Sequence, residues 1–286
     1  MQATNPSIPI PSPESLLNAL GMTEPSEINL ETLAGYCGAT IVYEQLEGCA
    51  AQLVGHDGRA FITVDSMARR ARQRFSAGHE LGHWMYDRGR VALACTEGNL
   101  TRDWHEGSRE RRANRYAAEL LLPARMFEPR ARDLPATFAS TRELAGIFET
   151  GITATAIRLV ELGPHVAMVV CCDRGERKWF VRSKGVPRGL WPVDRIAHSS
   201  NSVAARLLAG ETRVVPRHVI ADEWISHRNA HRYQVHEDSV LVLPNLTLTI
   251  LWWDDEQQIL DIDEDDELDD PEPLSGRLSF TRPRSR

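Results

Sequence analysis

The run His79-Glu80-Leu81-Gly82-His83 constrains this chain more than any other stretch. In a helix, His79 and His83 lie one turn apart on the same face and can bind one cation. Glu80 then stands beside the ion without having to be a ligand. A glutamate in that position can accept a proton from a metal-bound water, whose pKa the metal lowers towards neutrality. The pattern therefore predicts a zinc site of the hydrolytic type with Glu80 as its general base.

The flanks of this run favour a site over a coincidence. The same pattern can occur by chance on a polar surface helix that binds no metal. Here the neighbours are apolar or small. The helix is therefore expected to be buried, where unpaired histidines and a glutamate would be costly, and to let another backbone or a substrate approach closely. These neighbours are Phe75, Ala77, Gly78, Leu81, Gly82, Trp84 and Met85.

A third ligand is expected on the next helix, because a catalytic zinc binds three protein groups and leaves one position open for water. Residues 109–123 carry an apolar stripe at helical spacing, and extending it backwards reaches Glu110 and then Glu106. A carboxylate on a buried stripe needs a partner, which is zinc or, alternatively, a salt bridge to the surrounding arginines. His105 and Glu106 are the alternative ligands, and Asn114 is placed to orient a ligand.

Short helices and strands are predicted before the motif helix. Helices are expected over residues 13–20 and 29–36, and strands over residues 40–46, 50–54 and 60–64, the last two joined by a turn at 56–59. The strand at 60–64 is our candidate for an edge strand that accepts a substrate as an added strand, with a plain core strand as the alternative. Asp65 or Ser66 is expected to cap the motif helix, and Gly89 to end it.

Composition limits the classes of function. The chain has 286 residues and a formal net charge of -7, so it can bury one substantial core and a smaller one but has no general attraction to phosphates. No apolar run approaches the ~20 residues of a membrane span, and the first residues lack the features of a signal peptide. The five cysteines show no regular framework, which favours reduced thiols and a cytoplasmic location, with Cys171 and Cys172 in the core.

Two motifs in order resemble those of the ImmA/IrrE family of zinc metallopeptidases, which looks like the M78 peptidase class. The resemblance covers about residues 28–128 and rests on both motifs, which are far more specific together than the first alone. The motifs are Arg74-Phe75 ahead of His79-Glu80-Leu81-Gly82-His83, and Glu110-x-x-Ala113-Asn114-x-Tyr116-Ala117-Ala118 followed by Leu120-Leu121-Leu122-Pro123.

The resemblance implies a bacterial cytoplasmic protein with a minimal zincin domain. Its substrate would be a helix-turn-helix (XRE-like) repressor, whose cleavage derepresses stress, DNA-damage or mobile-element genes. By position, the family's metal ligands fall on His79, His83 and Glu110 and its catalytic glutamate on Glu80. The metal would be Zn²⁺, with Mn²⁺ as an alternative. The sequence departs from the family at Gly78, where Ala is usual; Gly weakens a helix by ~1 kcal/mol relative to Ala.

The segment after this unit is predicted to be a helical pair. Residues 140–143 form a capping box, and Thr153 is expected to cap a second helix that ends at Gly163. The pattern resembles a helix-turn-helix. A helix that reads DNA needs basic and amide side chains at its start, whereas residues 153–156 are small and Arg158 is the one cation. We therefore expect a structural pair or a docking surface for the repressor, and not direct DNA binding.

A second α+β module is expected near the C-terminal end. Hairpins are predicted over residues 166–181 and 239–253, with a helix at 202–208 between them. His227 and His231, with His236 nearby, have the spacing of metal ligands. Their segment is polar and no partner helix supplies a carboxylate, so a solvated face is expected there.

The predicted fold class is α+β: a minimal zincin-like metalloprotease domain, a helix-turn-helix-like helical pair and a C-terminal α+β domain, for which a sensor-like role is a fold-level analogy. The predicted function is a zinc-dependent endopeptidase of the HExxH type with no membrane contact. The alternative is a non-catalytic transcriptional regulator that binds a repressor or DNA. The predicted segments are residues 1–27 (N-terminal tail and short helix), 28–130 (zincin-like domain), 131–163 (helical segment), 164–253 (C-terminal domain) and 254–286 (acidic disordered tail).

Overall fold

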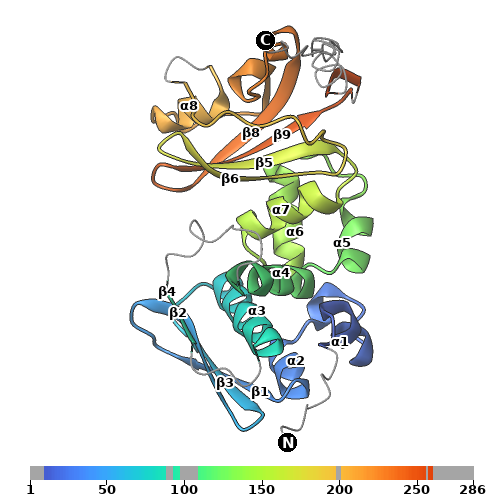
Figure 1. Ribbon diagram of the computed structural model, residues 1–286, viewed down its shortest axis with the longest axis vertical. Helices are drawn as coiled ribbons and strands as arrows, with labels where there is room; N and C mark the ends of the chain where they lie inside the picture. Colours follow the sequence, from blue (N-terminus) through green and yellow to red (C-terminus); the bar gives the residue numbers. More distant parts are fainter. Residues whose placement is uncertain (1–9, 88–92, 97–108, 198–200, 256, 260–286) are drawn as a thin grey trace, which may run out of the picture.

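Two sheets lie at opposite ends of an elongated molecule, with helices between them (Figure 1). The computed structural model describes residues 10–87, 93–96, 109–197, 201–255 and 257–259. Its mixed composition of helices and sheets confirms the predicted α+β class. No helix within these ranges is long and apolar enough to cross a membrane.

The N-terminal sheet has the strand order β1-β3-β2-β4. Its strands are β1 (Ala39–Glu44), β2 (Cys49–His56), β3 (Arg59–Asp65) and β4 (Leu93–Thr96). β2 and β3 form the predicted hairpin, and its turn residues Asp57 and Gly58 have φ of 49° and 76°, as a two-residue type I′ turn requires. The strand β4 was not predicted.

Of the two alternatives for residues 60–64, the edge strand is wrong and the core strand is confirmed. β3 pairs with β1 in parallel on one side and with β2 in antiparallel on the other, so its backbone groups are engaged along both edges. Ile62 and Val64 point into the core and are fully buried. β1 comes from a separate run of sequence, and its parallel pairing with β3 cannot be inferred from the sequence pattern of β3 alone.

Five helices up to residue 131 contribute to the core of this half in the described part of the chain (Figure 1). They are α1 (Pro13–Ala19), α2 (Leu30–Tyr36), α3 (Arg70–Tyr86), α4 (Arg109–Leu121) and α5 (Ala124–Ala131). α2 and α3 contact the sheet, and α4 packs against α3. α1 and α2 begin where predicted, each capped by a side chain, from Ser12 and Asn29. The short helix α1 adds Leu16 and Leu17 to the same core as the sheet. The helix α5 was not predicted.

The motif helix α3 begins later than predicted. Its N-cap is Arg69, which makes no side-chain capping bond. Asp65 does not cap the helix because its Oδ1 accepts a hydrogen bond from Met67 N at 3.1 Å in the turn after β3. Gly89, the predicted end, lies outside the described residues, and the described helix ends at Tyr86.

The helical pair α6 (Phe138–Phe148) and α7 (Ile152–Leu162) joins the two halves. α6 begins before the predicted capping box, because Thr137 is its N-cap and its Oγ1 accepts from Ser140 N at 3.3 Å. Gly151, not Thr153, is the N-cap of α7, and Gly163 ends the helix as predicted. Leu144, Phe148 and Leu159 belong to the N-terminal core, whereas Phe138, Ala156 and Val160 pack under the C-terminal sheet.

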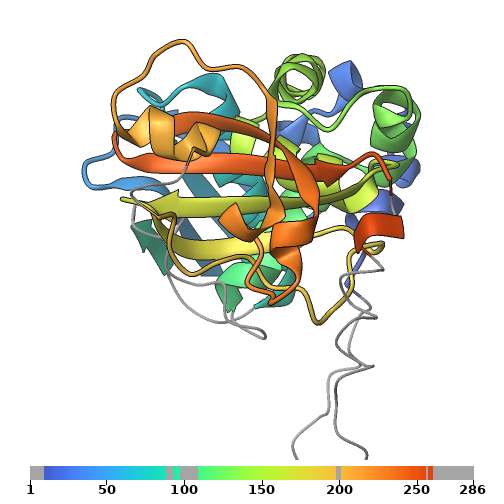
Figure 2. The same ribbon diagram turned by 90° about the horizontal axis from the view of Figure 1, so that it is seen from above.

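The C-terminal sheet has the order β6-β5-β9-β8-β7, and Figure 2 looks down on it. Its strands are β5 (Val166–Asp173), β6 (Glu176–Arg182), β7 (Arg217–Ile220), β8 (Gln234–Leu243) and β9 (Leu246–Trp253). Both predicted hairpins are present, and the predicted helix is α8 (Val203–Leu208). The strand β7 was not predicted. Cys171 and Cys172 are core residues as expected, and burial raises the pKa of each thiol to about 12.

The beginning of the predicted acidic tail belongs to the folded module. Ile259 is fully buried and packs in the core on the outer face of the C-terminal sheet. The tail was predicted to begin at residue 254, so its first residues include one apolar side chain that packs in this core. The rest of the predicted tail, residues 260–286, lies outside the described residues.

Candidate metal centre

The helix α3 places His79 and His83 one turn apart, as their spacing predicts. Both side chains are buried, with exposed fractions of 7% and 1%, and their Nε2 atoms lie 3.1 Å apart. Glu80, between them in sequence, is fully buried. The most polar part of the motif therefore lies inside the molecule, as the apolar flanks indicate.

Glu110 reaches the two histidines from α4. Its Oε2 lies 3.2 Å from His79 Nε2, and its Oε1 lies 3.3 Å from His83 Nε2. The two helices can approach this closely because of Gly82, where an added Cβ would lie 3.0 Å from the Cα of Ala113. The small residue thus makes room for another backbone, one of the two uses that the sequence suggested.

The three side chains fit a zinc ion. The two Nε2 atoms stand 3.1 Å apart, and each has one oxygen of Glu110 at 3.2 or 3.3 Å; tetrahedral coordination at usual Zn–N distances separates neighbouring ligand atoms by about 3.3 Å. Two imidazole nitrogens that face each other also share at most one proton, and a cation can replace that proton. His79, His83 and Glu110 are therefore the residues that would hold a metal here.

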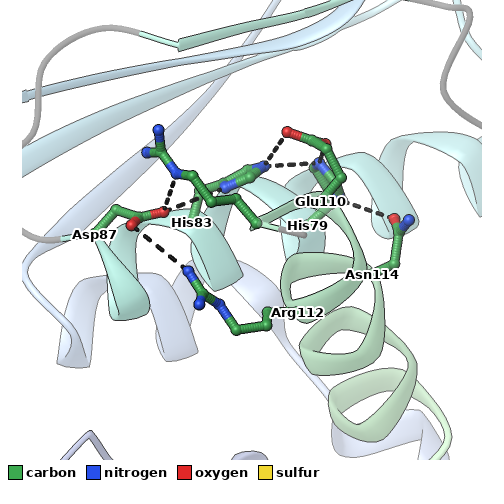
Figure 3. A network of polar contacts seen from close by, with 7 residues as sticks. His79, His83, Asp87, Glu110, Arg112 and Asn114 are labelled. Carbon is green, nitrogen blue, oxygen red and sulfur yellow. Dashed lines mark hydrogen bonds and ion pairs between the residues drawn. The ribbon is translucent and has the colours of Figure 1, made fainter. Parts of the chain in front are cut away.

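Asn114 supports the first histidine. Its Oδ1 lies 2.8 Å from His79 Nδ1 (Figure 3). The amide oxygen can only accept, so Nδ1 of His79 carries a proton, and Nε2, which faces Glu110, is the atom that would bind a metal. This is the orienting role that the sequence suggested for Asn114, one turn after Glu110 on α4.

Asp87 is a charged neighbour of the second histidine and was not predicted. Its Oδ2 lies 3.7 Å from His83 Nδ1, and Arg109 Nε holds the same oxygen at 3.1 Å, with Arg112 4.0 Å from the other oxygen (Figure 3). The arginines near Glu110 thus pair with Asp87, while Glu110 contacts the histidines. The available signal was the spacing, since Asp87 follows His83 by one helical turn.

The electrostatics of the site favour positive charge. Hydrogen bonding from His79 and then from His83 holds the pKa of Glu110 well below its usual range. Burial lowers the pKa of His83, but the contact with Glu110 and the charges of Glu110, Glu80 and Asp87 raise it, and the net shift is upward. A divalent cation would satisfy the same negative groups.

The other candidate ligands do not join this group. His105 and Glu106 lie outside the described residues. His227 and His231 do not share a helix, because the described structure there is a single 3-10 turn, Ala230–Arg232. The predicted solvated face holds for His231, which is exposed, but not for His227, which is half-buried.

Comparison with known proteins agrees with the site. Residues 34–160 match the family described as the IrrE N-terminal-like domain, Peptidase_M78. No curated protein matches the chain. Among solved structures, a Mycobacterium tuberculosis transcriptional regulator is similar with a TM-score of 0.55 at 14% identity, over 84% of this chain and 74% of that chain.

The two comparisons carry different weight. At 14% identity the solved structure shows a shared fold alone. The family match contains β1, β2 and β3 together with the whole of α3, α4 and α6, and so covers His79, His83 and Glu110. Residues 34–160 therefore form a peptidase M78 (IrrE N-terminal-like) domain, which supports the assignment to the ImmA/IrrE family.

Proposed function

We propose that this protein is a zinc-dependent endopeptidase that cleaves a helix-turn-helix transcriptional repressor. The observation that carries the proposal is the convergence of His79, His83 and Glu110 within a domain of a peptidase family. In this proposal the three residues hold Zn²⁺, or Mn²⁺ in its place. The bound ion supplies a polarised water and a Lewis acid for the peptide carbonyl.

Glu80 acts as the general base. Its charge acts on His83, so its carboxylate stands close to the ligands, on the same helix. It accepts the proton of the attacking water and returns it to the leaving amine. Asn114 and Asp87 keep the two imidazole rings in position through contacts with His79 and His83. In this proposal Glu80 transfers protons, whereas Asn114 and Asp87 orient the histidine ligands.

The substrate class rests on relatives. The ImmA/IrrE resemblance implies a repressor, and the similar solved structure is described as a transcriptional regulator. Both point to gene regulation. A repressor that is cut between its DNA-binding and dimerisation parts would release the genes that it controls.

The alternative function is regulation without cleavage. The DNA-binding form of this alternative is disfavoured by the burial of α7, in which Glu161 is the one exposed residue. A recognition helix must present a whole face to the major groove, whereas this helix packs against α6, α5 and the strands β5 and β6. In the other version of this alternative, the protein binds a repressor without cutting it, and an experiment must distinguish such binding from proteolysis.

The test compares wild type with Glu80→Gln. The metal content of both proteins is measured, and each is incubated with helix-turn-helix repressors, beginning with one encoded beside this protein. The variant should keep its metal, because Glu80 is not a ligand, and should cut about 10²–10⁴-fold more slowly. Glu119→Gln is the matched control, since Glu119 pairs with Arg115 at 2.8 Å, away from the centre.

Three outcomes would contradict the proposal. Equal rates of cleavage by wild type and Glu80→Gln would show that Glu80 is not the general base. Loss of metal from Glu80→Gln would make Glu80 a ligand. A repressor that binds the metal-loaded wild type and stays intact would favour the non-catalytic alternative.

A further inference from the structure

A second group of two histidines and a carboxylate lies in the C-terminal module. His218 comes from β7, His236 from β8, and Asp254 directly follows β9; their possible ligand atoms all lie within 4.8 Å of one another. The sheet register brings them together. His218 is paired with His236 across β7 and β8, and His236 with Trp252 across β8 and β9. Asp254 lies two residues after Trp252 and so shares its face of the sheet.

His236 is held in the centre of this group. Its Nε2 lies 2.5 Å from Asp254 Oδ2. The ring of Trp252 stacks on the His236 ring with centroids 4.7 Å apart, and the His218 ring stands edge-on at 3.8 Å. His218 Nδ1 lies 3.4 Å from the Oε1 of Gln234, and donation along this contact would leave its Nε2 as the ligand atom.

The chemistry of the group suits a transition metal. Two neutral imidazoles and one carboxylate are the donors that zinc, copper, nickel and iron(II) prefer, whereas magnesium and calcium need mostly oxygen. An imidazole binds a metal through a ring nitrogen that carries no proton. The Asp254 side chain is 72% exposed, so it can rotate to widen its short contact with His236 into a coordination geometry.

We propose that His218, His236 and Asp254 form a second site for a divalent transition-metal ion of the zinc type, separate from the centre between α3 and α4. The ion would join the short strand β7 to β8 and to the end of β9. Its remaining positions would face solvent, because His218 and Asp254 are exposed. An ion pair stacked on Trp252, without metal, is the interpretation that the experiment must exclude.

Metal stoichiometry tests the proposal in the full chain. Chelator-treated wild type should bind two equivalents of Zn²⁺ in a calorimetric titration, and His83→Ala should bind one, at the second site. Adding Asp254→Asn or His218→Gln to His83→Ala should lower the Zn²⁺ affinity of the second site at least about 10-fold. Substitution of a residue that only orients a ligand already lowers metal affinity that much. His231→Ala is the control; His231 is exposed, and its Nδ1 lies 2.9 Å from Arg228 O.

A second measurement covers the case in which His83→Ala does not fold. Cu²⁺ quenches the fluorescence of an indole in contact with its ligand, so wild type should lose emission at one equivalent in a way that Trp252→Phe does not. Asp254→Asn should shift this quenching to at least about 10-fold higher Cu²⁺. Binding that is unchanged by His218→Gln and Asp254→Asn, or no binding beyond the first equivalent, would overturn the proposal. Neither readout requires protease activity, so this site and the proposed function can fail separately.

Discussion

The two groups of two histidines and a carboxylate have the same donors in different surroundings. In the first, one helical turn sets the spacing of His79 and His83, and both are buried. In the second, strand pairing sets the spacing of His218 and His236, and the group is largely exposed. Donor type alone therefore does not define a site. Burial and the residues that support the ligands determine how tightly a metal is bound and whether water is excluded.

The largest expected loss of metal affinity follows substitution of Glu110, the carboxylate of the buried group. Glu110→Ala should weaken Zn²⁺ binding at the first site at least about 100-fold, since supporting residues alone account for 10–100-fold, and should leave the second site unchanged. Glu119→Ala, on the same helix and paired with Arg115, should bind as wild type does. Competition with a chromogenic chelator measures both. Equal affinity in the two variants would move the third ligand away from Glu110, with Glu106→Ala as the next variant to measure.

A smaller effect is expected from the residues that orient the histidines. Asn114 contacts His79 at 2.8 Å, whereas Gln234 contacts His218 at 3.4 Å on an exposed surface. Asn114→Ala should weaken metal binding at the first site about 10–100-fold, and Gln234→Ala should have less effect on the second. Direct titration of each variant gives the comparison. A larger effect from Gln234→Ala would show that burial does not strengthen such support.

The smallest effect on metal binding is expected from the packing that builds the first site, where the change is in folding stability. An added Cβ at Gly78 would lie 3.4 Å from the Cβ of Ala117, an ordinary contact, whereas one at Gly82 would lie 3.0 Å from the Cα of Ala113. Both substitutions to Ala gain the same helix propensity, about 1 kcal/mol. Gly82→Ala should therefore be less stable than Gly78→Ala by about 1–3 kcal/mol, the usual cost of overpacking.

Urea unfolding of the two glycine variants checks this difference. Gly146→Ala provides a reference, because a Cβ there meets no atom within 4 Å, and it should stabilise α6 by about 0.5–1 kcal/mol. Equal stability of Gly78→Ala and Gly82→Ala would mean that α3 and α4 can move apart freely. The first site would then be less rigid than its contacts indicate.

The sequence determined the parts of the first site that depend on local periodicity. A helical turn is enough to place His79 beside His83, and the apolar stripe of α4 was enough to indicate which face carries Glu110. The hairpin turn at Asp57 and Gly58 follows from its own backbone preferences. The roles of these residues in binding and catalysis stay predictions, as do the segment boundaries, although α1 and the helical pair share the core of the N-terminal unit.

Only the tertiary structure decided the relations between distant segments. The parallel pairing with β1 places β3 inside the sheet. In the described part of the chain, Arg109 and Arg112 form ion pairs with Asp87 and not with Glu110. The tertiary structure also grouped His236 with His218 and Asp254, whereas sequence proximity grouped it with His227 and His231. The physical reason is the same in each case. Helical spacing depends on residues that are close in sequence. Strand order, register and ion pairing depend on which surfaces the whole chain buries together.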